Sequence, residues 1–158
     1  MAGLLLATIG SRSPAQQTLE GRAVAVVDGD TLTVLIEGGS VTVSLSDVDA
    51  PELDQRHGDL ASQALAGLVL QRQVRLLSRG VSGSGEITAW VFTNGTRVNV
   101  ELVQRGHAWV YGEDEVQDDL VQAEADARAA RRGLWADDDP VPPWEWRADS
   151  SNAAAGAR

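Results

Sequence analysis

The sequence of 158 residues contains no cysteine, no lysine and only two histidines. Without cysteine the chain can form no disulfide, thiol nucleophile or thiolate-bound zinc, and two histidines are too few for a histidine-rich metal cluster. Any metal ion must therefore be bound mainly by oxygen atoms, the ligands that hard ions such as calcium and magnesium prefer.

Long hydrophobic runs are also absent. The longest, Leu4–Ile9, is far shorter than the roughly 20 residues that span a bilayer, which argues against a membrane protein. The small residues Ser13 and Ala15 follow it, as at a signal-peptidase site, but no positively charged segment precedes it. Two interpretations of residues 1–15 stay open: the remnant of a signal peptide, which would make the protein secreted or periplasmic, or a disordered tail.

Positive charge is scarce. The 13 arginines face 23 acidic residues, for a formal net charge of −10, so the chain lacks the wide basic surface with which many proteins hold nucleic acid. An apolar content of 43% suits one compact domain of this length. We place the domain at residues 16–147, between the tail of residues 1–15 and an Ala/Ser/Gly-rich tail, residues 148–158, that we expect to be unstructured.

The first part of this domain follows the two-residue period of β-strands. Asp28-Gly29, a strong turn signal, separates two runs rich in β-branched residues and predicts a hairpin. Strict alternation in the third run places Val43 and Leu45 on one face and Ser44 on the other. The predicted strands are residues 19–27, 31–36, 41–45, 74–77 and 87–92.

The apolar period changes to that of a helix at residues 58–70, and helices are also predicted at 98–105 and 116–132, the last ending at Gly133. The predicted fold is α+β and mainly β. It is a five-stranded Greek-key barrel of the OB-fold type, with one helix after the third strand and two C-terminal helices.

Four motifs in register, followed by a tail segment, carry a resemblance over about residues 20–147. They are Val27–Thr31 (VDGDT), Asp49–Glu52 (DAPE), Gly95–Ala108 (GTRVNVELVQRGHA), Glu124–Trp135 and Pro142–Trp146 (PPWEW). Their order and spacing resemble the staphylococcal nuclease, or thermonuclease, family. The resemblance implies an OB-fold barrel and calcium-dependent hydrolysis of phosphodiesters, with single-stranded DNA or RNA as the candidate substrate.

Phosphodiester hydrolysis needs an activated water and a cation that neutralises the charge growing on the phosphate. Asp30 follows the first turn and Asp49 and Glu52 follow the third strand, so barrel pairing can bring them to one rim. The resemblance implies that Asp30, Asp49 and the backbone carbonyl of Ala50 bind Ca2+, or another hard divalent cation. It implies that Glu52 contacts the ion through water and orients or deprotonates the attacking water.

The sequence departs from the family at two positions. The resemblance implies two phosphate-binding arginines, but the matching positions hold Ser44 and Glu86. One arginine that stabilises a transferring phosphoryl group contributes roughly 10³ to 10⁵ in rate, so we predict weak or altered catalysis. Arg56 and Arg79 lie on nearby loops and are either substitutes for the missing arginines or solvated surface residues.

Two functions remain. The first is a calcium-dependent nuclease of altered activity, which the retained carboxylates favour. The second is a catalytically inactive, nuclease-derived OB-fold module that binds a protein, a peptide or nucleic acid, which the missing arginines and the acidic charge favour. We expect a monomer in either case.

Histidine and tryptophan side chains also have structural interpretations. His57 has the right pKa range for acid–base chemistry, but loop histidines are commonly just exposed, and His107 lies in an apolar stretch typical of packing. Trp135, Trp144 and Trp146 could stack on bases, but their place after the last predicted helix favours packing of the tail against the barrel.

Overall fold

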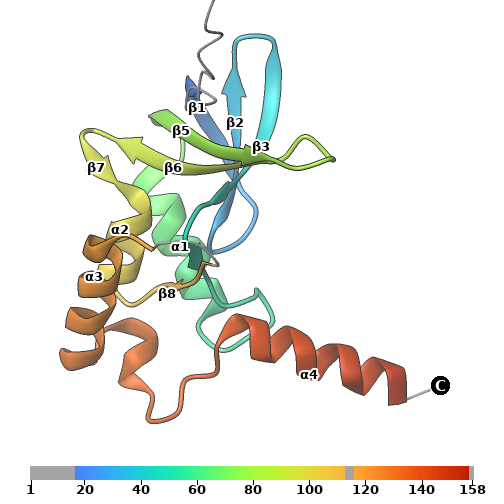
Figure 1. The fold of residues 1–158 in the computed structure, drawn as a ribbon, viewed down its shortest axis with the longest axis vertical. Helices are drawn as coiled ribbons and strands as arrows, with labels where there is room; N and C mark the ends of the chain where they lie inside the picture. The colour runs from blue at the N-terminus through green and yellow to red at the C-terminus, as the bar shows by residue number, and fades with distance from the viewer. Residues whose placement is uncertain (1–16, 113–115, 157–158) are drawn as a thin grey trace, which may run out of the picture.

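The computed structural model describes residues 17–112 and 116–156 and contains the predicted barrel (Figure 1). Its antiparallel strands run in the order β3-β2-β1-β5-β6, and a parallel pairing of β3 with β6 closes the sheet on itself. The predicted OB-type architecture is thereby confirmed. The five strands are β1 (Thr18–Val26), β2 (Thr31–Ile36), β3 (Gly39–Leu45), β5 (Gln73–Val81) and β6 (Ile87–Thr93). Residues 1–15, for which a signal-peptide remnant or a tail was predicted, lie outside the described residues.

Three two-residue strands complete the sheets: β4 (Val48–Asp49), β7 (Thr96–Arg97) and β8 (Trp109–Val110). β7 extends the edge of β6, whereas β4 pairs with β8, with Asp49 opposite Trp109. Because of this second pairing, the backbone of Asp49 is fixed against the segment that follows the second helix. The position of a candidate site residue thus depends on a segment sixty residues further along the chain.

The three predicted helices are present as α1 (Gly58–Val69), α2 (Val98–Gln104) and α3 (Asp118–Ala129), and a short 3-10 helix, η1 (Gly133–Ala136), follows them. Asn99 on α2 is fully buried, accepts a hydrogen bond from the backbone N–H of Val91 at 3.0 Å and donates one to the carbonyl oxygen of Ser46 at 2.8 Å. A buried amide with satisfied partners fixes orientation strongly. Asn99 thereby holds α2 against β6 and the chain that leads to Asp49.

A second hydrophobic cluster lies outside the barrel and consists of Trp109, Ala127, Leu134 and Trp135, with Trp144 packed against it. The ring centroids of Trp109 and Trp135 are 4.2 Å apart in an edge-to-face arrangement, a favourable geometry for aromatic pairs. Trp135 and Trp144 therefore pack against other side chains, as predicted from the sequence. The cluster fixes the start of the C-terminal segment.

The prediction that residues 148–158 are unstructured is wrong for residues 148–156, and residues 157 and 158 lie outside the described part of the chain. A fourth helix, α4, runs from Pro143 to Gly156 and projects away from the barrel (Figure 1). Proline is favoured at the first helical position, and the later residues include several alanines, the best helix former. None of the helices in the described ranges is long and apolar enough to cross a membrane.

Candidate active site

The β1–β2 turn presents Asp30. The side chain of Asp28 accepts hydrogen bonds from the backbone N–H groups of Asp30, at 3.1 Å, and Thr31, at 2.8 Å, and so shapes the turn. The carboxylate of Asp30 accepts a hydrogen bond from the backbone N–H of Ala50 at 2.7 Å and one from the Thr31 hydroxyl at 3.1 Å. The turn and the Asp49–Glu52 loop, twenty residues apart, are therefore joined through the Asp30 side chain.

The pKa of Asp30 is raised to about 7, mainly by burial and also by the negative charges of Asp28 and Asp49, against the lowering effect of the hydrogen bonds from Ala50 and Thr31. Among the described residues, no cation is one of the groups that shift the pKa of Asp30. A positive ion placed between Asp30 and Asp49 would relieve both the burial cost and the repulsion.

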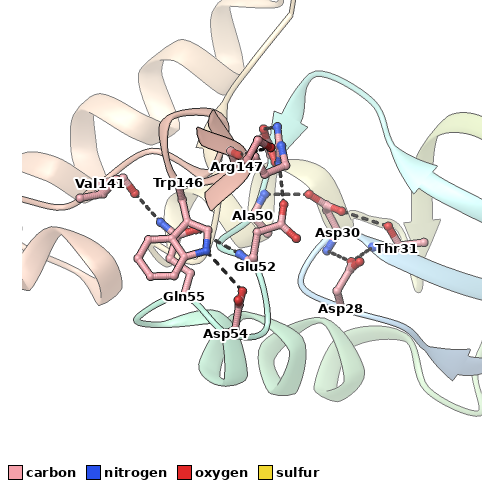
Figure 2. A network of polar contacts seen from close by, with 12 residues as sticks. Asp28, Asp30, Thr31, Ala50, Glu52, Asp54, Gln55, Val141, Trp146 and Arg147 are labelled. Atoms are coloured by element: carbon pink, nitrogen blue, oxygen red, sulfur yellow. Dashed lines mark hydrogen bonds and ion pairs between the residues drawn. The ribbon is translucent and has the colours of Figure 1, made fainter. Parts of the chain in front are cut away.

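Asp49 and Glu52 share one cation, which comes from α4. Arg147 binds Asp49 in a two-pronged arrangement, Nη1 to Oδ1 at 3.1 Å and Nη2 to Oδ2 at 2.7 Å, and its Nη1 also donates to Glu52 Oε1 at 2.7 Å (Figure 2). These hydrogen bonds raise the pKa of Arg147 further above its already high value. This geometry is the strongest form of the arginine–carboxylate pair.

Sequence reasoning missed Arg147 altogether. Its signal lay in the PPWEW motif, where Pro143 marks a helix start, and residues 144 and 147 then fall on one face of that helix, three positions apart. Trp144 packs on the second hydrophobic cluster. Because Arg147 lies on the same face of the helix, this packing also turns Arg147 toward Asp49 and Glu52. The prediction of an unstructured tail after residue 147 left no helix there, and without that helix the position of Arg147 could not be inferred.

The two positions where arginines were expected now contact each other. The Ser44 hydroxyl on β3 donates a hydrogen bond to Oε1 of Glu86, forty-two residues away, just before β6. In the β2–β3 register Ser44 lies opposite Thr31, whose hydroxyl binds Asp30. The serine–glutamate pair thus lies beside the carboxylate site, where it supplies negative charge in place of two positive charges.

The two candidate substitutes have other partners. Arg56 forms an ion pair with Asp137 at 2.7 Å and is 83% exposed, and the guanidinium of Arg79 lies 4.7 Å from the ring centroid of Trp90. Among the contacts of residues 17–112 and 116–156, the cation at Asp49 and Glu52 is Arg147. The alternative interpretation of Arg56 and Arg79, as surface residues with local roles, agrees with these contacts.

Comparison with known proteins bears on these carboxylates. Residues 42–137 match the protein family described as "Staphylococcal nuclease homologue". The chain belongs to the staphylococcal nuclease family. A protein called "Micrococcal nuclease" from Shigella flexneri is 35% identical over 89% of this chain and 87% of its own length. An "Uncharacterized endonuclease" of Haemophilus influenzae is 39% identical over 80% of this chain and 71% of its own, and "Protein ParB" of Escherichia coli is 36% identical over 96% and 92%.

Nucleases of the staphylococcal nuclease family generally depend on calcium, so the donor chemistry of this site can be tested against that ion. In the described part of the chain, no three acidic or histidine side chains gather closely enough to hold a metal ion by themselves. Asp30 faces Ala50, while Asp49 and Glu52 face Arg147. The available donors are nevertheless all oxygen atoms, and the raised pKa of Asp30 marks an environment that a cation would stabilise. The residues therefore fit a hard divalent ion held by two carboxylates and backbone or water oxygens.

A pair of histidines lies near the same loop. Nε2 of His57, the residue before α1, lies 3.2 Å from Nδ1 of His107, and the two rings stack with centroids 5.4 Å apart. Burial lowers the pKa of His107 to about 4, with the charges of His57 and Arg105 adding to the effect, and burial also lowers the pKa of His57. The pair is therefore neutral at pH 7 and joins the loop after Glu52 to the segment before β8.

This pair predicts a loss of stability in acid. In the unfolded chain His107 titrates near its ordinary pKa, so between about pH 6.5 and 4 the unfolded state binds more protons and stability falls as the pH falls. Because the ring is partly open to water, we expect His107→Gln to remove only about 1 kcal/mol of the fall in unfolding free energy between pH 7 and pH 4.5. Urea denaturation of both proteins at the two pH values measures this difference. Equal losses would show that the pair does not couple to folding.

Proposed function

We propose that this protein is a calcium-dependent phosphodiesterase that hydrolyses single-stranded DNA or RNA, with an activity altered by Ser44 and Glu86. One observation carries the proposal: Asp49 and Glu52 converge on a single guanidinium while Asp30 is joined to the same loop through Ala50. Relatives whose names denote nucleases support the reaction class. Glu52 is a half-buried carboxylate that water can reach, which suits a group that takes a proton from an attacking water.

Asp30, Asp49 and the backbone carbonyl of Ala50 would hold the calcium ion, which when bound supplies positive charge to the phosphate as negative charge develops on it. Glu52, with its side chain 34% exposed, can be reached by both water and substrate. Asp30, by contrast, is partly buried, and its carboxylate accepts hydrogen bonds from the Thr31 hydroxyl and the Ala50 N–H. The two carboxylates thus suit different tasks: Asp30 suits binding of the ion, and Glu52 suits exchange of a proton.

In the proposed reaction Glu52 accepts a proton from a water molecule as the water oxygen forms a bond to phosphorus. The bond between phosphorus and one ester oxygen breaks, and the released alkoxide takes a proton from solvent. The products are a phosphomonoester and an alcohol, and Glu52 returns its proton to solvent. The Ser44–Glu86 pair offers no positive charge to the pentacoordinate phosphate, which is why we expect slow turnover.

Glu52→Gln tests the proposal, because it keeps the size and one acceptor oxygen of the side chain but removes its basicity. We expect calcium-dependent cleavage of a labelled single-stranded oligonucleotide to fall at least ~10²-fold, the usual lower range for losing a positioned base. Added chelator should abolish the wild-type activity. Titration calorimetry with calcium should show heat for the wild type and none for an Asp30→Asn, Asp49→Asn double variant.

Glu145→Gln serves as the matched control, because Glu145 is an exposed carboxylate on the first turn of α4. It should cleave like the wild type. Cleavage that survives Glu52→Gln, or a wild type that binds nucleic acid and calcium without cleaving, would contradict the proposed enzyme. The second of these results would favour the inactive binding module.

A further inference from the structure

We infer that Arg147 is a catalytic residue of this site: its guanidinium, delivered by α4, binds the scissile phosphate in place of the arginines missing at positions 44 and 86. This inference rests on the proposed function and assigns it a residue from outside the barrel. Residues 42–137, which match the family, do not include Arg147. The assignment therefore comes from the contacts of α4 alone.

Charge balance requires a second cation at this site. Asp30, Asp49 and Glu52 carry up to three negative charges, and a single divalent ion would still leave a net negative charge facing an anionic phosphodiester. Glu86, beside Ser44, adds to that repulsion. Within the described residues the cation bonded to Asp49 and Glu52 is Arg147, so substrate binding is more favourable if Arg147 stays than if it leaves.

The guanidinium also has donors to spare. Arginine carries five N–H bonds in one plane, and the hydrogen bonds to Asp49 and Glu52 use three of them. The side chain is 45% exposed, so its remaining N–H groups are accessible to a phosphate approaching from solvent. Two carboxylates hold the group in one orientation beforehand, which lowers the cost of ordering it in the transition state.

Four contacts anchor the chain just before Arg147. The Gln55 amide donates to the carbonyl oxygen of Val141 at 2.7 Å, and the Trp146 indole donates to Asp54 at 3.3 Å (Figure 2). Trp144 stacks on Tyr111 at 5.0 Å between ring centroids and also packs against Trp109. The start of α4 is thus bonded directly to the loop that follows Asp49, so the position of Arg147 relative to Glu52 is fixed.

The test uses the full chain as wild type, Arg147→Gln, Arg147→Lys, Arg147→Ala and Arg131→Gln. Arg131 is the matched control, since it also pairs with an aspartate, Asp138, at 2.8 Å but lies after α3. We expect Arg147→Gln to lower kcat by ~10²-fold with a small change in KM, the loss typical of one transition-state donor. Arg147→Lys should keep part of the kcat that Arg147→Gln loses, because lysine still supplies a point charge. Millimolar guanidinium chloride should partly restore the kcat of Arg147→Ala.

Two binding measurements accompany the kinetics. Arg147→Gln removes one positive charge near the ion, so calorimetry should show that this variant binds calcium roughly threefold to tenfold more tightly than the wild type. This is the size expected for charges a few ångström apart near a surface. A phosphorothioate oligonucleotide, which resists cleavage, should bind Arg147→Gln about tenfold more weakly in calcium, roughly the value of one charge-assisted hydrogen bond. Arg131→Gln should match the wild type in every assay.

Cleavage by Arg147→Gln that equals or exceeds the wild type would overturn the inference and show that α4 blocks the site. Loss of activity without rescue by guanidinium, together with a lowered Tm, would overturn it in favour of a structural role. If Glu52→Gln leaves cleavage intact, or no cleavage occurs, the proposed function fails instead. Oligonucleotide affinity then still decides the role of Arg147, and equal affinities of wild type and Arg147→Gln would refute it.

Discussion

Replacing Ser44 and Glu86 together by arginine is expected to accelerate calcium-dependent cleavage of single-stranded DNA by roughly 10³-fold, a conservative share of what phosphoryl-binding arginines supply. The two side chains already meet, since the serine hydroxyl bonds to the glutamate. Ser44 also lies opposite Thr31, the neighbour of Asp30, so an arginine there begins beside the proposed ion site. The measurement is the initial rate with a labelled oligonucleotide at saturating calcium.

Each single substitution should accelerate cleavage by much less than about 30-fold, which is the square root of the gain expected for the pair. Arginine at 44 alone would pair with Glu86 and be neutralised, because the two positions are within hydrogen-bond distance of each other. Arginine at 86 alone removes the repulsion but has a serine as its neighbour. Residues in direct contact are the ones whose effects fail to add, so the pair should show positive coupling.

The same double variant also tests whether Arg147 acts as a substitute. If barrel arginines and Arg147 perform one task, adding Arg147→Gln to the double variant should cost less than ~10-fold, against ~10² in the wild-type background. A double variant that remains slow while folded and calcium-bound would show that the missing arginines do not limit the reaction. Equal costs of Arg147→Gln in both backgrounds would show that the two sets of arginines act independently.

The barrel and its first three helices could be predicted because their signals are local. The Asp28-Gly29 turn and the alternation around Ser44 each depend on a few neighbouring residues, and the structure contains the corresponding hairpin and strand. The proximity of Asp30 to the Asp49–Glu52 loop followed from strand order once the barrel was assumed. The hydrogen bond from the Ala50 N–H to Asp30 supports that step.

The position of Arg147 could not be obtained in this way. Its contacts with Asp49 and Glu52 cross ninety-eight and ninety-five positions of sequence, and no periodicity links those segments. They are brought together by the second hydrophobic cluster and by hydrogen bonds to Gln55 and Asp54, which depend on three-dimensional packing. The Ser44–Glu86 bond is similar, because the sequence shows two substitutions but not that they contact each other.

Gly106→Ala is expected to destabilise the protein more than any other substitution discussed, because this residue joins the barrel to the C-terminal segment. Gly106 has φ +74°, and a methyl group there would lie inside contact distance of the backbone carbonyl of Arg132. Its own carbonyl accepts a hydrogen bond from the N–H of Leu134 at 2.9 Å. Backbone pressed against backbone cannot relax as a side chain can, so we expect a loss of about 3 kcal/mol or more in unfolding free energy.

Gly95→Ala is the matched control. Gly95 also has a positive φ, +80°, but no atom lies within 4 Å of an added methyl group there, so only the cost of the left-handed conformation remains, about 1 to 2 kcal/mol. The difference between the two variants isolates the steric contact. At roughly 2 to 4 °C per kcal/mol for a chain of this size, a loss of about 3 kcal/mol lowers the Tm of Gly106→Ala by about 6 to 12 °C, whereas a loss of about 1 to 2 kcal/mol lowers that of Gly95→Ala by about 2 to 8 °C, so Gly106→Ala should show the lower Tm.

The contact at Gly106 also bears on function, since it sets the start of η1 and therefore the place of Leu134 and Trp135 in the second hydrophobic cluster. Trp144 packs on that cluster, and Arg147 follows within one helical turn. At a temperature where Gly106→Ala is still folded, we therefore expect its cleavage rate to fall toward that of Arg147→Gln, whereas Gly95→Ala keeps the wild-type rate. A folded Gly106→Ala with full activity would show that Arg147 reaches Asp49 and Glu52 without the second cluster to place it.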